Sequence, residues 1–302
     1  MEGSISPSDL AKAYMNRGLS LNNTGNYDKA LRDYGECIRI MEEQQANGRF
    51  YIPSDLAKAY MNRGLSLNNI GKYDEALRDY EKCIRIMDDL QAKDRLYEPD
   101  DLAKAYLNRG TTYAQTGKYN EALRDYGECI RIREALQKQG RLYDPNALAK
   151  AYMGCGAVYW STGKYEKALH DYGKCIRIME ALHVQNRLYD PIDLAKAYMN
   201  RGNAFQSTGK LDKALCDYDA GIHIMEDLKD NGKLYEISVL ASTMLNKGIL
   251  LFTEFQDADS AMKIWSQAID LLENQDSLSY ATNYTLGLLY QAVDEATHNK
   301  SI

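Results

Sequence analysis

The chain has 302 residues, of which 45% are hydrophobic, and its formal net charge is −6. No run of about 18 apolar residues is present to span a membrane, and the acidic balance argues against a nucleic-acid binder. The opening residues MEGSISPSDLAKAY lack the apolar stretch of a secretion signal. We therefore expect a cytoplasmic, globular protein that binds neither nucleic acid nor membrane.

The first predicted element is a pair of helices within residues 9–53. Tyr14 and Gly18 are four residues apart and share one face of a helix. Gly25 ends this helix, and Ala30 and Tyr34 restore the same spacing in a second one. Two helices joined by so short a turn form an antiparallel hairpin.

The hairpin then recurs with a fixed period. The glycine of the first helix returns every 46 residues, at Gly18, Gly64, Gly110, Gly156, Gly202 and Gly248. Such a period is the signature of a solenoid, in which neighbouring hairpins bury each other's apolar faces. We predict one solenoid domain over residues 1–302, with repeats at about 9–53, 54–99, 100–145, 146–191, 192–237 and 238–275 and a capping helix at 277–299.

An ordered set of bulky, small and aromatic residues marks each repeat. In the third repeat the set is Tyr106, Gly110, Tyr113, Ala122, Tyr126 and Cys129. It resembles the tetratricopeptide repeats, whose usual unit has about 34 residues. The resemblance implies an all-α, right-handed superhelical solenoid that binds other proteins without catalysis.

The 46-residue unit is twelve residues longer than the family's usual unit. We place the extra residues between one hairpin and the next, in longer second helices that run into interrepeat loops. Those loops are expected to contain four prolines, Pro53, Pro99, Pro145 and Pro191.

Four cysteines share one repeat position, at Cys37, Cys83, Cys129 and Cys175. Helices pack about 10 Å apart, so equivalent positions of stacked hairpins lie beyond the ~7 Å limit for a disulfide. We expect buried, free thiols. The histidines lack metal-ligand spacing and no nucleophile has a base beside it, so we expect no metal, no cofactor and no enzyme activity.

One face of each first helix is not needed for packing. Lys12 and Asn16 lie one turn apart on it, and the family resemblance places this face on the inner, concave surface. Its lysines are Lys12, Lys58, Lys104, Lys150 and Lys196, and its asparagines are Asn16, Asn62, Asn108, Asn200 and Asn246.

A row of asparagines suits an extended peptide, because each amide both donates and accepts hydrogen bonds. The lysines would favour acidic side chains. We therefore predict a scaffold or adaptor that holds an extended, acidic peptide segment of an unidentified protein partner in its groove.

Two alternatives stay open. Asparagine is common at this position in the family, and pairs such as Asp55 and Lys58 would make ordinary surface ion pairs, so that the rows would be structural. The alternative function is self-assembly into a homo-oligomer through the solenoid ends or the interrepeat loops.

A second charged pattern lies beside the asparagines. Arginine follows them at Arg17, Arg63, Arg109 and Arg201, and aspartate recurs in the second helices at Asp33, Asp79, Asp125, Asp171 and Asp217. We predict an ion pair within each hairpin. The fourth repeat is the expected exception, since Cys155 there takes the place of the arginine.

Overall fold

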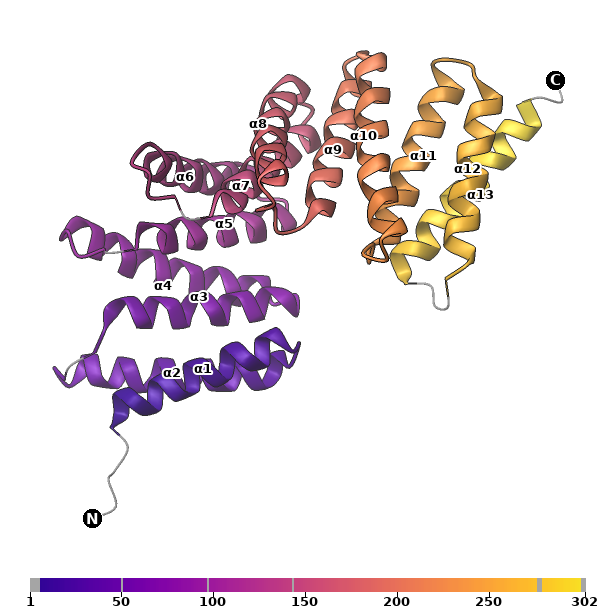
Figure 1. Ribbon diagram of the computed structural model, residues 1–302. Helices are drawn as coiled ribbons and strands as arrows, with labels where there is room; N and C mark the ends of the chain where they lie inside the picture. Colours follow the sequence, from indigo (N-terminus) through magenta and orange to yellow (C-terminus); the bar gives the residue numbers. More distant parts are fainter. Residues whose placement is uncertain (1–5, 50, 97, 143, 276–278, 300–302) are drawn as a thin grey trace. The chain divides into compact units, whose positions relative to one another are not determined.

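The computed structural model describes residues 6–49, 51–96, 98–142, 144–275 and 279–299. Within them the secondary structure is helical, and consecutive helices pair as antiparallel hairpins (Figure 1). The helices are α1 (Pro7–Asn23), α2 (Tyr27–Ala46), α3 (Pro53–Asn69), α4 (Tyr73–Ala92), α5 (Pro99–Gln115), α6 (Tyr119–Lys138), α7 (Pro145–Ser161), α8 (Tyr165–Val184), α9 (Pro191–Ser207), α10 (Leu211–Asp230), α11 (Ile237–Thr253), α12 (Ala258–Glu273) and α13 (Tyr280–Asn299). The predicted all-α solenoid of helix hairpins is confirmed.

The four repeated prolines begin helices and do not lie in the loops, which corrects the sequence-based expectation. Pro53, Pro99, Pro145 and Pro191 are the first residues of α3, α5, α7 and α9. Proline suits this place because its φ is already helical and its missing N–H would have no intrahelical partner. The second helices are indeed long, with 20 residues in α2 against 17 in α1.

Each hairpin closes tightly around the glycine of its first helix. A Cβ atom at Gly64 would lie 2.8 Å from the ring of Tyr80, so a larger side chain would drive α3 and α4 apart. In the sixth hairpin the partner of Gly248 is Trp265, whose Nε1 donates to the backbone oxygen of Leu245. The glycine and the aromatic ring thus set the distance between the two helices.

The chain divides into two compact units, residues 1–154 and 155–302, whose boundary lies within α7. In the first unit Cys37, Cys83 and Cys129 belong to one buried cluster. In the second unit Trp265 is the largest buried side chain. No helix of the described ranges is long and apolar enough to cross a membrane.

The shared cysteine position is buried, as predicted. Cys37, Cys83, Cys129 and Cys175 are free thiols without solvent exposure. Burial raises the pKa of the Cys83 thiol to about 12 and that of Cys37 to about 11. These sulfurs therefore behave as small apolar packing groups.

Candidate protein-interaction face

The predicted lysines and asparagines lie on the first helices, which contact one another across successive repeats. In the first unit α1 touches α3 and α3 touches α5, and in the second unit α9 touches α11. We call the side that carries these residues the first-helix face. Lys12, Asn16 and Lys150 are exposed on it, whereas Lys58, Asn62, Lys104, Asn108, Lys196, Asn200 and Asn246 are half-buried.

The asparagines differ in their contacts. Asn62 donates to the sulfur of Met15 in the preceding repeat at 3.5 Å, and Asn246 donates to Asn203 Oδ1 at 3.1 Å. Within the described residues, the side chains of Asn16, Asn108 and Asn200 form no hydrogen bond. Part of the row therefore links neighbouring repeats, and part of it offers unused amides.

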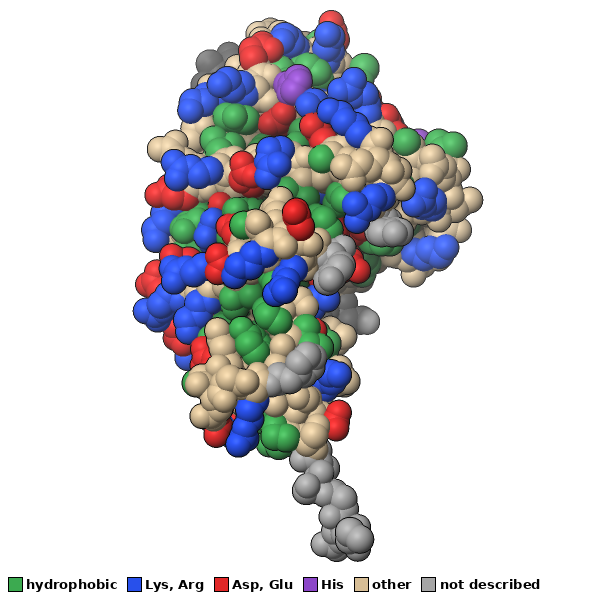
Figure 2. Space-filling view, turned by 90° about the vertical axis from the view of Figure 1, so that its left-hand side faces the viewer, with side chains coloured by type: hydrophobic (Ala, Val, Ile, Leu, Met, Phe, Trp, Pro, Cys, Tyr) green, Lys and Arg blue, Asp and Glu red, His purple; other side chains and the backbone are tan. Residues whose placement is uncertain are grey.

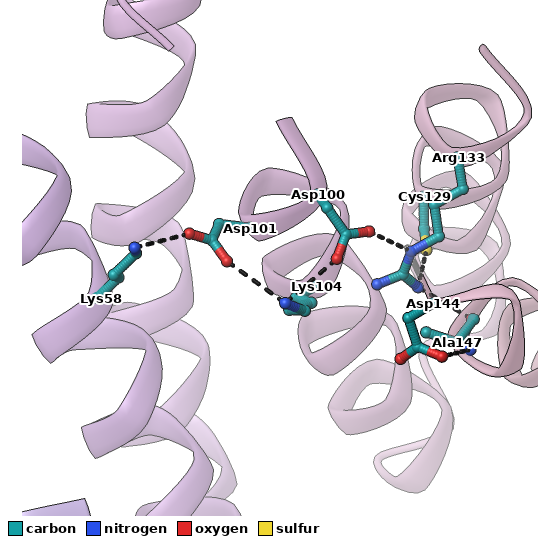
Figure 3. A network of polar contacts seen from close by, with 8 residues as sticks. All are labelled: Lys58, Asp100, Asp101, Lys104, Cys129, Arg133, Asp144 and Ala147. Atoms are coloured by element: carbon teal, nitrogen blue, oxygen red, sulfur yellow. Dashed lines mark hydrogen bonds and ion pairs between the residues drawn. The ribbon is translucent and has the colours of Figure 1, made fainter. Parts of the chain in front are cut away.

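Several of the lysines form ion pairs with carboxylates of the same chain. Lys58 Nζ lies 3.0 Å from Asp101 of the next repeat, not beside Asp55 as simple helix spacing suggested. Lys104 lies 3.2 Å from Asp100 and 3.5 Å from the same Asp101. The Lys58–Asp101 pair joins α3 to α5, and Lys104 extends the network within α5 (Figure 3). In the second unit, Lys196 pairs with Glu236, the residue directly before α11, at 2.6 Å.

The network of charges around Lys104 also includes a buried arginine. Arg133 is fully buried and occupies a position where four other repeats have methionine, at Met41, Met87, Met179 and Met225. Its Nε donates to Asp100 at 2.8 Å, and its Nη1 donates to the Ala147 carbonyl at 2.9 Å (Figure 3). Burial alone would raise the pKa of Asp100, but the hydrogen bonds and charges of Arg133 and Lys104 outweigh it and lower the pKa.

A further polar row escaped the sequence reasoning. Ser66 Oγ donates to Asn22 Oδ1 at 2.6 Å, and Thr112 Oγ1 donates to Asn68 Oδ1 at 2.7 Å. Each bond joins a first helix to the first helix of the preceding repeat. The signal was the recurrence of a hydroxyl residue and an asparagine at fixed repeat positions.

The predicted arginine–aspartate pairs are present in four hairpins. Each arginine donates to both carboxylate oxygens of its aspartate, in the pairs Arg17–Asp33, Arg63–Asp79, Arg109–Asp125 and Arg201–Asp217. In the fourth repeat, where Cys155 replaces the arginine, Asp171 contacts His170 at 2.9 Å. These pairs join the two helices of one hairpin.

Charges of both signs also lie elsewhere on the surface. On the side of the molecule drawn in Figure 2, acidic and basic side chains alternate. Many are neighbours on one helix, such as Arg131 and Glu128, whose charged atoms lie 2.8 Å apart. Such a surface is well hydrated and carries mixed charge.

Family models extend over more than half of the chain. One tetratricopeptide repeat model matches residues 55–135 and again 101–181, and a second matches residues 10–43. The chain belongs to the tetratricopeptide repeat family. No curated protein matches it closely in sequence.

Solved structures share the fold of this tetratricopeptide repeat protein at low sequence identity. BtubC from P. vanneervenii is 22% identical, with a TM-score of 0.59 over 70% of this chain and 78% of that one. A signal-transduction ATPase with a tetratricopeptide repeat sensor from Pyrococcus horikoshii is 13% identical, with a TM-score of 0.69 over 96% of this chain and 43% of that one. A Rap protein complexed with competence and sporulation factor is 14% identical, with a TM-score of 0.57 over 98% of this chain and 77% of that one. Membership of the family makes the protein an interaction scaffold, which binds other proteins or peptides.

Proposed function

We propose that the first-helix face of residues 6–154 binds an extended segment of another protein and performs no catalysis. The observation that carries the proposal is the row of amides at Asn16, Asn62 and Asn108, one from each successive repeat. Two of these three amides form no hydrogen bond within the described residues. An extended peptide presents unpaired N–H and C=O groups, which an amide can satisfy together.

The repeat spacing fits an extended chain. Adjacent helices pack about 8–10 Å apart, and an extended peptide advances about 3.3 Å per residue. Each repeat would therefore meet the peptide about once every three residues. Side chains of the peptide between these points would contact Met15, Met61 and Leu107, which are half-buried between the rows.

The lysines would favour acidic residues in the bound segment. Lys58 and Lys104 already share Asp101, but their side chains keep 40% and 45% exposure. A partly exposed ammonium has three donors and can contact a second carboxylate. Lys12, which is exposed at the start of the row, would add a further positive charge.

The test selects peptides from a random displayed library against the wild-type protein and measures their affinity by fluorescence polarisation. Changing Asn16, Asn62 and Asn108 together to Ala should weaken binding at least tenfold, because three hydrogen bonds contribute about 0.5–1.5 kcal/mol each and about 1.4 kcal/mol is a factor of ten.

The matched control changes three exposed amides of the second helices, Gln45, Gln91 and Gln137, to Ala. This variant should keep wild-type affinity, and circular dichroism should show that both variants fold alike. Equal affinity of all three proteins would place the peptide elsewhere and leave the asparagine row with a structural role.

Self-assembly through the solenoid ends or the interrepeat loops is the second candidate. Multi-angle light scattering distinguishes it, because a self-assembling protein gains mass with concentration in the absence of any peptide. A mass that stays at one chain, 34.3 kDa, would count against it.

A further inference from the structure

A tyrosine and a carboxylate meet at most boundaries between repeats. The tyrosine comes from a first helix, and its hydroxyl donates to a glutamate of the preceding second helix. The pairs are Tyr60–Glu42, Tyr152–Glu134, Tyr198–Glu180 and, at α13, Tyr290–Glu273. Tyr60 and Tyr152 are 2% and 4% exposed, so the ring fills the boundary and the hydroxyl meets the carboxylate at its edge.

The boundary between α10 and α11 lacks the tyrosine but keeps the carboxylate. Glu226 follows Glu180 by one 46-residue period, whereas Met244 stands one period after Tyr198. Met244 is 4% exposed. Within the described residues, Glu226 is exposed and has no hydrogen-bond partner.

A pocket of about 470 Å³ lies beside Met244 at this boundary. Glu226, Met244 and Gln267 line it. They are the counterparts of Glu42, Tyr60 and Lys82, which surround the phenol at the first boundary, with the nitrogen of Lys82 4.8 Å from the centre of the Tyr60 ring. We call this cavity the Met244 pocket.

The rest of the lining is mixed, with the apolar residues Ile237, Leu240 and Leu271 and the polar residues Lys229, Asp270, Asn274 and Gln275. Leu240 is buried, and Ile237 and Leu271 are half-buried. Asp270 and Lys229 stand exposed at the rim together with Glu226. A planar apolar group with one hydrogen-bond donor at its end therefore matches the pocket.

We propose that the Met244 pocket binds the side chain of an unmodified tyrosine presented by a partner protein. The ring would lie beside Met244 on the half-buried Ile237 and Leu271, and the hydroxyl would donate to Glu226. The protein itself supplies the precedent, because the same frame of helices holds a phenol against a glutamate at four other boundaries. Two carboxylates against one lysine leave the rim with a net negative charge, which disfavours a phosphorylated tyrosine and favours the neutral phenol.

The site is tested with p-cresol, which is the tyrosine side chain without its backbone. In protein labelled with ¹³C at the methionine methyl groups, p-cresol should shift the Met244 signal saturably at millimolar concentration, with the signal assigned by its loss in Met244→Leu. Toluene, which lacks the hydroxyl, and 4-methylphenyl phosphate should bind at least threefold more weakly.

Three variants locate the binding. Glu226→Ala should weaken p-cresol at least threefold and leave toluene unchanged. Met244→Tyr should fill the pocket and raise the melting temperature. Because this variant lacks the Met244 methyl group, its binding of p-cresol is measured by saturation-transfer NMR of the ligand, and that signal should be lost. Tyr60→Met, the reciprocal change, should create a second p-cresol site beside Glu42.

The proposal is overturned if toluene binds as tightly as p-cresol or if Met244→Tyr leaves p-cresol binding unchanged. It is also overturned if methylguanidinium binds more tightly than p-cresol, since the rim carboxylates would then select a cation. Should Met244→Tyr fail to fold by circular dichroism, Glu226→Ala and the gain of a site in Tyr60→Met still decide the question.

Discussion

At the scale of the residue, the arginine–aspartate pairs show how burial determines how much an ion pair contributes to stability. Arg109 and Asp125 expose 17% and 3% of their side chains, with nitrogen and oxygen 2.7 Å apart. Arg17 makes the same contact with Asp33, but its side chain is 65% exposed. Solvent screens the second pair and weakens it.

We expect Arg109→Met to lower the free energy of unfolding by about 3 kcal/mol, because both members of this pair are shielded from solvent and the loss of the arginine leaves the carboxylate unpaired there. Urea unfolding followed by circular dichroism measures the change. Arg17→Met, the control, should cost less than half as much, and the double change Arg109→Met with Asp125→Leu should recover most of the loss. An equal loss of unfolding free energy in Arg109→Met and Arg17→Met would show that burial does not determine how much the pair contributes to stability.

Thiol reactivity should follow exposure. Cys216 is exposed, whereas the other five cysteines are buried, and burial raises the pKa of Cys175 to about 12. In native protein at pH 8, Ellman's reagent should titrate one thiol quickly and the other five only after unfolding in guanidinium chloride. Cys216→Ser should lack the fast phase; a remaining fast phase would mean that a core cysteine is accessible.

At the scale of the element, close contact outweighs helix propensity where the two helices of a hairpin meet. Ala favours a helix over Gly by about 1 kcal/mol. At Gly64 this gain is opposed by a contact of 2.8 Å with Tyr80, whereas at Gly127, on α6, nothing lies within 4 Å.

We therefore expect Gly64→Ala to destabilise the protein by about 1–3 kcal/mol, which is the usual cost of overpacking. Gly127→Ala should stabilise it by up to about 1 kcal/mol. Thermal unfolding of both variants beside the wild type gives the comparison. A stabilising effect at both positions would show that α3 and α4 can separate at little cost.

The Arg133–Asp100 pair, which joins α5 and α6, predicts that stability depends on pH. The pKa of Asp100 is lowered in the folded protein, so its contribution to stability is present above the unfolded pKa of about 3.9 and is lost as the pH falls through the lower folded value. The wild type should therefore exceed Arg133→Met in free energy of unfolding by the largest amount above about pH 5, and this difference should shrink as the pH falls.

Urea unfolding of the wild type and Arg133→Met at a series of pH values tests this. Arg131→Met is the control, because Arg131 is 61% exposed and pairs with Glu128 on the surface. Its small difference from the wild type should change little with pH. A constant difference for Arg133→Met would show that the charge of Asp100 does not contribute.

At the scale of the whole molecule, contacts connect helices that are one or two places apart along the chain. A solenoid of this kind transmits a local change mainly to neighbouring repeats. Hydrogen exchange in Arg109→Met should therefore rise in α5 and α6 and in the helices that touch them. Exchange in α11 and α12 should match the wild type, and a uniform rise would instead indicate a single cooperative unit.

The sequence by itself determined the repeat, the hairpins, the burial of the shared cysteines and the arginine–aspartate pairs. These features depend on spacing within one 46-residue unit, where the helical period determines which residues lie on the same face of a helix. The recurrence of each residue type in successive units made the assignment firm.

Only the tertiary structure decided which groups meet between units. It paired Lys58 with Asp101, bound Asn62 to Met15 and Arg133 to the carbonyl of Ala147, and formed a pocket beside Met244. The atoms in these contacts belong to helices of different repeats or to the two helices of a boundary. Their separation depends on how hairpins pack against one another, and periodicity along the chain does not specify that distance.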